Sequence, residues 1–256
     1  MNDTLDLRQP VRLLIDPDCA DTDAAKRLTE LFSTDTDSEL TLHLTAEGLS
    51  LVSGEQMLRG DFTHLIPRLG QHKLASELLV RAAKLKDTEH PTVLDATAGL
   101  GEDSFILAAA GFTVDLYERN PVIHALLRDA LERAAQLPEL APIVGRMTLH
   151  HEDSIAAMAS LETPPDVILL DPMFPERQKS ALVKKKLQMI QKLETPCDDE
   201  KTMLFTAAKV SPRKLIVKRP PKGPYLADIK PDYSIAGKAV RFDVIAVPGE
   251  KLKKHF

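Results

Sequence analysis

The sequence lacks tryptophan, has only two cysteines in 256 residues, and contains no apolar run long enough to cross a bilayer. Cys19 and Cys197 lie far apart, and neither stands in a CxxC or metal-ligand spacing. This use of cysteine is typical of a reduced, intracellular protein rather than of a disulfide framework. The acidic, polar start MNDTLDLRQP does not have the pattern of a secretory signal. We therefore expect a globular cytoplasmic protein without membrane contact.

An excess of basic residues is also missing, because the formal net charge is −5. This excludes a uniformly basic nucleic-acid binder but is compatible with a local basic face. The hydrophobic fraction of 43% is that of an ordinary globular protein. The length is sufficient for one large core, or for one core with a small appendage.

The first part of the chain predicts a small α+β lobe over residues 1–65, followed by a larger domain over residues 66–256. VRLLID is typical of a short strand, and DTDAAKRLTELF of a helix capped by Asp21 or Thr22. ELTLHLTAEGLSLVSGE alternates apolar and polar residues on both sides of AEG, which indicates a β-hairpin. A single amphipathic helix is expected over LGQHKLASELLVRAAKL. Its apolar face comprises Leu74, Leu78, Leu79 and Ala82.

Beyond His90, strands and helices alternate, which predicts an α/β fold with parallel βαβ units and a doubly wound sheet. The pattern shows six strands: TVLDA, TVDLYE, RMTLHH, DVILLD, RKLIVKRP and VRFDVIAVP. Helices are expected over EDSFILAAAG, PVIHALLRDALERAAQL, a short segment from Ser154, and PERQKSALVKKKLQMIQKL. The last two strands have no long helix between them, so we expect them to form an antiparallel hairpin at one sheet edge.

Ligands of such sheets bind beyond the carboxyl ends of the strands. The first strand runs into LDATAGLGEDSF, where Gly99 and Gly101 allow a tight turn and a close approach of the backbone to a ligand. A dinucleotide site would have a third glycine, where this sequence has serine. Glu102 and Asp103 at the helix start would repel a pyrophosphate, but with Asp95 they suit the ammonium and sulfonium groups of S-adenosylmethionine.

The next two strands also end in acidic residues. Glu118 can accept hydrogen bonds from both ribose hydroxyls of an adenosine, a demand that NAD and S-adenosylmethionine share. Asp153 could accept from the adenine amino group, and Ser154 is expected to cap the following helix. The alternative interpretation is that Asp153 and Ser154 form a helix cap and nothing more.

The fourth strand ends in VILLDPMFPERQK, which has no structural explanation as a strand end. An exocyclic base amine is a poor nucleophile, and its methylation requires acceptors that hold its protons. Asp171 and the Pro172 carbonyl offer such acceptors, and Phe174 offers a flat face for an unstacked base. No cysteine nucleophile for cytosine C5 methylation lies nearby. His150 and His151 are adjacent on a strand and point to opposite faces, so we predict no metal site.

The segments DATAGLGEDSF, LYERNP, DPMFPERQKSALVKKK and LIVKRP together resemble the class I S-adenosylmethionine-dependent methyltransferases, and more narrowly the RsmJ family. The resemblance covers residues 64–247 and implies a Rossmann-like, seven-stranded sheet. It also implies methyl transfer to the N2 amine of a guanine in small-subunit (16S) ribosomal RNA, as naked RNA or in the 30S particle. The residues that it places at the cofactor or beside the transferred methyl are Glu102, Asp103, Glu118, Arg119, Asp153, Ser154 and Asp171.

Two basic segments follow the last parallel strands and fit phosphate contacts with RNA. The first comprises Arg177, Lys179, Lys184, Lys185 and Lys186, and the second comprises Lys218, Arg219 and Lys222. A solvated helix face is the alternative interpretation for residues 184–186. Three other functions remain open: an adenine-N6 methyltransferase acting on DNA or RNA, a nicotinamide-dependent oxidoreductase, and a non-catalytic RNA-binding assembly factor.

Overall fold

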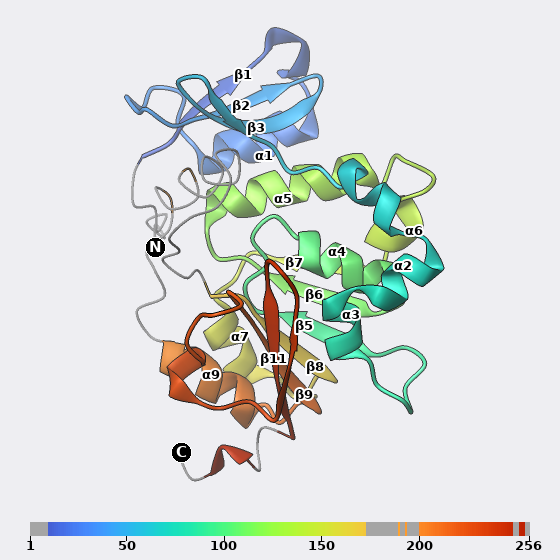
Figure 1. The fold of residues 1–256 in the computed structure, drawn as a ribbon. Helices are drawn as coiled ribbons and strands as arrows, with labels where there is room; N and C mark the ends of the chain where they lie inside the picture. The colour runs from blue at the N-terminus through green and yellow to red at the C-terminus, as the bar shows by residue number, and fades with distance from the viewer. Residues whose placement is uncertain (1–9, 173–188, 190–192, 194–199, 248–250, 254–256) are drawn as a thin grey trace.

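The computed structural model describes residues 10–172, 189, 193, 200–247 and 251–253 (Figure 1). The helix expected over PERQKSALVKKKLQMIQKL therefore lies outside the described residues, except for Met189 and Leu193. The chain forms a four-stranded sheet near its N-terminus and a seven-stranded sheet flanked by helices. No helix in the described part of the chain combines the length and the apolar character that a membrane span requires.

The small sheet has the strand order β1-β2-β3-β4, with β1 parallel to β2 and the other pairs antiparallel. The predicted strand, helix and hairpin are all present, and the Thr22 side chain caps the helix by accepting from the Ala25 N–H at 3.1 Å. The short strand β4 was not predicted, because three residues are too few to show alternation. The elements are β1 (Arg12–Ile15), η1 (Pro17–Cys19), α1 (Asp23–Leu31), β2 (Thr41–Thr45), β3 (Gly48–Ser53) and β4 (Gln56–Leu58).

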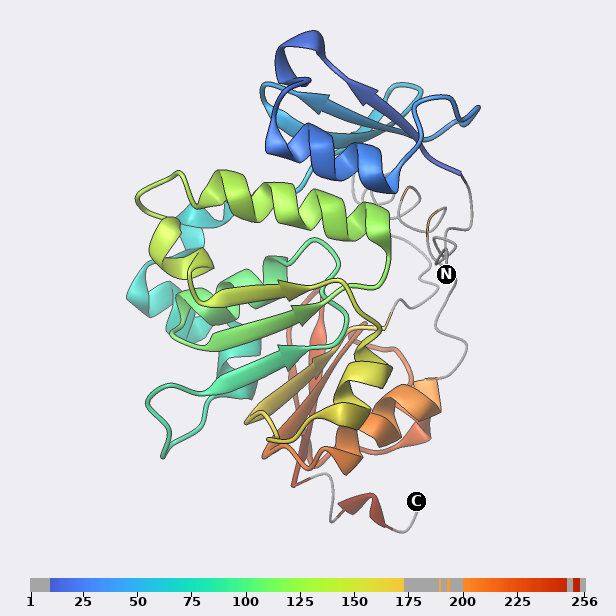
Figure 2. The same ribbon diagram turned by 180° about the vertical axis from the view of Figure 1, so that it is seen from behind.

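The small sheet packs on helix α5 (Pro121–Ala134) of the larger part (Figure 2). Leu42 and Leu51 from the sheet share a buried cluster with Leu126 of this helix. At the rim of the contact, Arg27 donates to both carboxylate oxygens of Glu132 at 2.7 and 2.8 Å. Burial of these apolar side chains fixes the position of the small sheet relative to the larger one.

The connecting segment departs from prediction. Two short helices replace the single amphipathic helix, which is therefore a wrong prediction. Glu77 between them is extended (φ −58°, ψ 130°), and its carboxylate accepts from Arg68 in two bonds of 2.8 Å. Leu79 and Ala82 are buried as expected, but Leu74 is only half-buried. The elements are η2 (Thr63–Arg68), α2 (Gln71–Ser76) and α3 (Leu78–Ala83).

The large sheet has the strand order β10-β11-β9-β8-β5-β6-β7. Strand β11 runs opposite to the other six, which all point the same way. The seven strands are the number that the resemblance implies, and β9 and β11 are antiparallel as expected, but they do not form the edge of the sheet. The edge strand is the unforeseen β10, whose side chains are mostly exposed and show no alternation. Helix α9 was also not predicted. The strands are β5 (Thr92–Asp95), β6 (Thr113–Tyr117), β7 (Met147–His150), β8 (Val167–Leu170), β9 (Lys214–Arg219), β10 (Tyr233–Ala236) and β11 (Arg241–Ala246).

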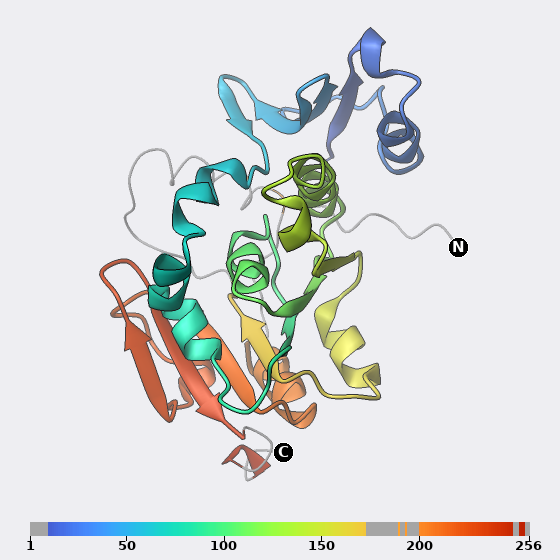
Figure 3. The same ribbon diagram turned by 90° about the vertical axis from the view of Figure 1, so that its right-hand side faces the viewer.

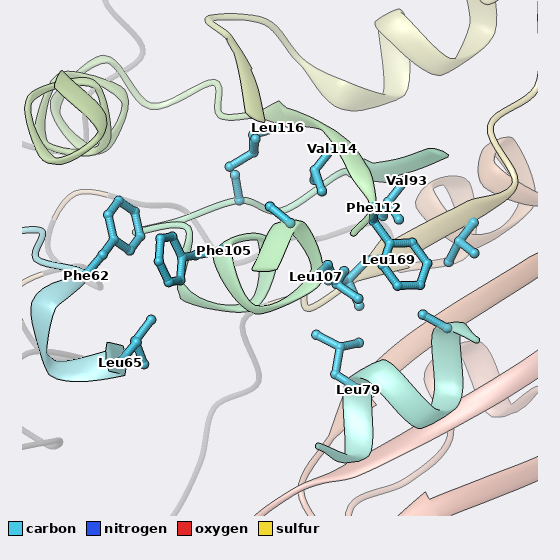
Figure 4. Packing of buried hydrophobic residues seen from close by; sticks show 14 of the residues in the cluster. Phe62, Leu65, Leu79, Val93, Phe105, Leu107, Phe112, Val114, Leu116 and Leu169 are labelled. Atoms are coloured by element: carbon cyan, nitrogen blue, oxygen red, sulfur yellow. The ribbon is translucent and has the colours of Figure 1, made fainter. Parts of the chain in front are cut away.

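Helices cover both faces of this sheet (Figure 3). Successive strand residues point to opposite faces, so Val93 packs towards α3 and α4, and Leu94 towards α7 and α9. On the first face the Phe62 ring stacks on Phe105 with 4.7 Å between ring centroids (Figure 4). Phe62 thus belongs to the core of the large sheet, while the division at residue 65 stays a prediction. The remaining elements are α4 (Glu102–Ala109), α6 (Ala141–Val144), α7 (Ser154–Ser160), α9 (Glu200–Lys209) and η3 (Leu226–Asp228).

Candidate active site at the carboxyl ends of the sheet

The strand order reverses between β5 and β8, so the ends of these strands form the switch point at which α/β sheets bind ligands. The turn after β5 uses its glycines as expected. Gly101 has φ +76°, and a Cβ there would lie 2.7 Å from Leu127 Cδ1. Around Gly99 (φ +55°), an added Cβ would meet nothing closer than the Thr97 carbonyl at 4.0 Å. The backbone at Gly99 is therefore open to close approach by a ligand.

Glu118 connects this turn to the end of β6 through hydrogen bonds of its carboxylate. It is 5% exposed, and its two oxygens accept from the N–H groups of Gly99 at 3.1 Å and Asn120 at 2.8 Å. Asn120 was not predicted as a site residue. Its side chain caps α5 by accepting from Val122 and Ile123, and the NP pair at a helix start was the signal for this role.

Asp95 is the most deeply buried acid of the site, at 2% exposure. It accepts from the Ser104 hydroxyl at 2.6 Å and from the Thr97 N–H at 3.0 Å. Burial raises the pKa of Asp95 to about 6, because these hydrogen bonds offset only part of the desolvation and the charges of Asp103 and Asp171 add to it. A ligand cation placed against Asp95 would meet an acid that titrates near neutral pH.

Lys218 lies between two carboxylates of the site, one on α4 and one beyond β8. Its Nζ is 2.5 Å from Asp103 Oδ2 on α4 and 2.9 Å from Asp171 Oδ2 beyond β8. Burial lowers the pKa of Lys218, but the two carboxylates outweigh it and raise the pKa above its ordinary value. The Asp171 N–H donates to Thr97 Oγ1 at 2.7 Å. Two segments far from it in sequence, the turn after β5 and strand β9, thus fix the position of Asp171.

The two basic residues at the end of β9, predicted to bind RNA, have partners within the protein. The Lys218 ammonium is directed at Asp103 and Asp171 inside the site, not at an external phosphate. The Arg219 side chain is 1% exposed and donates to Glu200 at 3.2 Å and to the Pro224 carbonyl at 3.1 Å. The Arg219 guanidinium is enclosed by α9 and the loop that follows β9, which does not favour the phosphate contact predicted for it.

The remaining predicted cofactor residues lie at the same edge. Asp153 caps α7 by accepting from the Ile155 N–H at 2.8 Å, so the cap is Asp153 and not Ser154, which is buried in the first turn. Arg119 reaches the Asp153 carboxylate at 3.4 Å, and Glu102 lies 3.5 Å from His64. Pro172 is buried directly after Asp171. The predicted site residues Phe174, Arg177, Lys179, Lys184 and Lys185 lie outside the described residues.

A family model described as "Putative SAM-dependent methyltransferase" matches residues 25–247. A relative named ribosomal RNA small subunit methyltransferase J from Thioalkalivibrio sulfidiphilus is 45% identical over 80% of this chain and 84% of its own length. The protein of the same name from Nitrosococcus oceani is 47% identical over 65% of this chain and 66% of its own length.

A solved structure agrees with both sequence comparisons. The crystal structure of a SAM-dependent methyltransferase from Neisseria gonorrhoeae matches with a TM-score of 0.74 and 32% identity, covering 92% of this chain and 96% of that one. The fold of the chain is therefore shared with a solved relative over almost its whole length. The chain belongs to the ribosomal RNA small subunit methyltransferase J family of S-adenosylmethionine-dependent methyltransferases.

Proposed function

We propose that this enzyme transfers the methyl group of S-adenosylmethionine to the exocyclic N2 amine of a guanine in small-subunit (16S) ribosomal RNA. The observation that carries the proposal is Asp171 at the switch point beside the acid-lined glycine turn, with its backbone N–H bonded to Thr97 and its carboxylate paired with Lys218. The name of the relatives supports ribosomal RNA as the substrate. We further propose that the enzyme acts in the cytoplasm, on this RNA or on the 30S particle.

The residues present fit S-adenosylmethionine and not a nicotinamide dinucleotide. Asp95 would hold the ammonium group, Glu118 the ribose hydroxyls and Asp153 the adenine amine. The open backbone at Gly99 allows the ligand to lie close to the turn. When bound, the cofactor supplies an electrophilic methyl group on a sulfonium. The carboxylates of the site stabilise that cationic ligand, whereas they would repel a pyrophosphate.

The role of Asp171 is to accept an N–H of the target amine. The lone pair of this amine is delocalised into the ring, and a carboxylate acceptor raises the electron density on nitrogen during attack. A fixed acceptor also orients the amine for in-line transfer. The Asp171 backbone is fixed by the hydrogen bond to Thr97, and its carboxylate by the Lys218 ammonium. Catalysis is therefore mainly positioning and electrostatics.

A carboxylate at this position favours guanine over adenine. Guanine presents its N1–H next to the N2 amine, so two donors face the acceptor oxygens of Asp171. Adenine presents an unprotonated N1 acceptor beside its N6 amine, which a carboxylate would repel. This difference supports N2 methylation of guanine over the adenine-N6 alternative.

The test is transfer of labelled methyl groups to 30S particles, and separately to naked 16S RNA, from cells that lack this protein. Nucleoside analysis is expected to give N2-methylguanosine at one position. Formation of N6-methyladenosine would contradict the choice of base. Absence of transfer to either substrate, with S-adenosylmethionine binding intact, would contradict the choice of ribosomal RNA. Preference for one of the two preparations would identify the natural substrate.

The raised pKa of Asp95 predicts a pH dependence of cofactor binding. The ligand ammonium favours the ionised carboxylate, so affinity for S-adenosylmethionine should fall as pH drops below about 6. Between pH 7 and pH 5 we expect a loss of about tenfold, measured by calorimetry. Asp95→Asn should remove most of this dependence and bind weakly at both pH values. An affinity of the wild type that is flat across this range would contradict the proposed ammonium contact.

The raised pKa of Asp95 makes the ligand-free protein less stable as pH rises, which is opposite to its effect on cofactor affinity. Asp95 holds its proton more tightly in the folded state than at its ordinary pKa of 3.8. Its contribution to stability is therefore fully present below pH 3.8 and is lost as pH rises through about 6. Cofactor binding at neutral pH offsets this loss, because the bound cation stabilises the ionised form.

A further inference from the structure

The loop after β9 lies at the same edge of the sheet as the proposed methyl-transfer site. Strand β9 ends at Arg219, and in the antiparallel pair this residue faces Arg241, where β11 begins. Strand β8, which leads to Asp171, is the neighbour of β9 on its other side. Adjacent strands are about 4.8 Å apart, so Arg241 is roughly 10 Å from the end of β8. This separation is on the scale of neighbouring nucleotides in an extended RNA strand.

Arg241 anchors this loop through every part of its guanidinium. Nε and Nη2 each donate to the Asp243 carboxylate at 2.8 Å. Nη1 donates to the Pro221 carbonyl at 3.0 Å, and Nη2 also donates to the Gly223 carbonyl at 3.1 Å. The Arg241 side chain is only 11% exposed. It is therefore a structural cation that fixes the backbone of residues 220–225.

The Tyr225 ring lies on this cation. The guanidinium carbon of Arg241 is 5.0 Å from the ring centroid, a cation–π contact, and the tyrosine is 37% exposed. The backbone that follows is unusual, because Ala227 and Asp228 are non-glycine residues with φ of +49° and +59°. Such left-handed residues persist where the surrounding structure imposes them. The loop thus presents a large aromatic ring at the surface on a rigid support.

The charges around Tyr225 suit RNA. Residues 212–241 carry eight basic and two acidic side chains, and the basic ones that are exposed are Arg213, Lys222, Lys230 and Lys238. Lys222 and Lys238 are exposed at the carboxyl edge, in the Tyr225 loop and in the hairpin between β10 and β11. At the opposite edge, Arg213 pairs with Asp87, and Lys214 donates to backbone carbonyls. By contrast, residues 10–60 carry ten acidic and four basic side chains, which would repel phosphates.

We propose that Tyr225 is a stacking platform for an unpaired nucleobase next to the target guanine, with Lys222 and Lys238 contacting the adjoining phosphates. The inference rests on the proposed function for its substrate. To reach Asp171, the guanine must leave its stack, and its neighbour then loses a stacking partner. An aromatic face replaces that partner whatever the sequence, because every base has a π-face. The platform would add to RNA affinity and to positioning without touching the cofactor.

The test compares Tyr225→Ala with Tyr225→Phe, and uses Tyr233→Ala as a matched control. Tyr233 is also exposed, at 42%, but it lies on the outermost strand β10, three strands from β8 and outside the Tyr225 loop. The measured quantities are the Kd for unmethylated 16S RNA without cofactor, the KM for this RNA, and the Kd for S-adenosylmethionine. We expect Tyr225→Ala to raise the RNA Kd and KM about tenfold. Tyr225→Phe and Tyr233→Ala should match the wild type, and cofactor affinity should be unchanged in all three.

Wild-type RNA affinity in Tyr225→Ala would overturn the proposed stacking role. An equal loss of RNA affinity in Tyr225→Phe would also overturn it, because the effect would then belong to the hydroxyl group. If Tyr225→Ala does not fold, Tyr225→Leu takes its place, since it keeps apolar bulk but has no flat ring. RNA binding is measured without methyl transfer, so the stacking role of Tyr225 and the proposed reaction can be refuted independently. A wild type that binds RNA through Tyr225 yet forms no N2-methylguanosine would refute the proposed reaction alone.

Discussion

Replacing Asp171 with alanine is expected to lower methyl transfer by about 10²- to 10³-fold, while the affinity for S-adenosylmethionine stays within a few-fold of the wild type. The variant loses the carboxylate that we propose as acceptor for the N–H of the target amine, so the amine would be neither oriented nor made more nucleophilic. The cofactor contacts proposed for Asp95 and Glu118 remain, and loss of the Asp171 charge favours the ionised form of Asp95. Single-turnover transfer to unmethylated 16S RNA measures the first quantity, and calorimetry the second.

The companion variant Asp171→Asn separates charge from shape. It keeps a hydrogen-bond acceptor of the same size but removes one of the two carboxylate partners of the Lys218 ammonium. We expect transfer to remain well below the wild type, because half of the amide end is a donor that would face the donors of guanine. Turnover at the wild-type rate by Asp171→Ala would refute the role of this residue as the amine acceptor.

Replacing Lys218 with methionine is expected to lower transfer at neutral pH by about 10- to 100-fold and to move the acidic limb of the pH–rate profile to higher pH. Without its ammonium, Asp103 and Asp171 face each other and the buried Asp95 without a compensating charge. Mutual repulsion makes these carboxylates take up a proton more readily, and a protonated Asp171 is a weaker acceptor. The measurement is kcat against pH, together with thermal unfolding.

Lys218→Arg is the matched control, because it keeps the positive charge, and it should retain the wild-type pH profile even if its rate falls. The competing interpretation, in which Lys218 contacts an RNA phosphate, gives a different pattern. Loss of a phosphate contact would raise the KM for RNA and its salt dependence, with kcat and the pH profile unchanged. That pattern in Lys218→Met would exclude the ion-pair role.

Much of the site was predictable from local sequence. Acids that directly follow apolar strands must lie at the carboxyl edge of a parallel sheet, whatever the rest of the chain does. Asp95, Glu118, Asp153 and Asp171 are found there for that reason. The glycines of the first turn were equally readable, since Gly101 occupies a left-handed position in which a Cβ would collide with Leu127. The alternation of strands and helices determined the fold class in the same local way.

Contacts between distant segments were not predictable. The break at Glu77 depends on its ion pair with Arg68, and β10 is a strand only because β11 lies beside it. Lys218 and Arg219 look equivalent in sequence, as two basic residues at a strand end. Neighbouring strand residues point to opposite faces, so one meets Asp103 of α4 and the other meets Glu200 of α9. Local sequence determined which groups reach the edge of the sheet, whereas the tertiary packing decided which charges they meet, because Coulomb interactions depend on distance in space and not on separation along the chain.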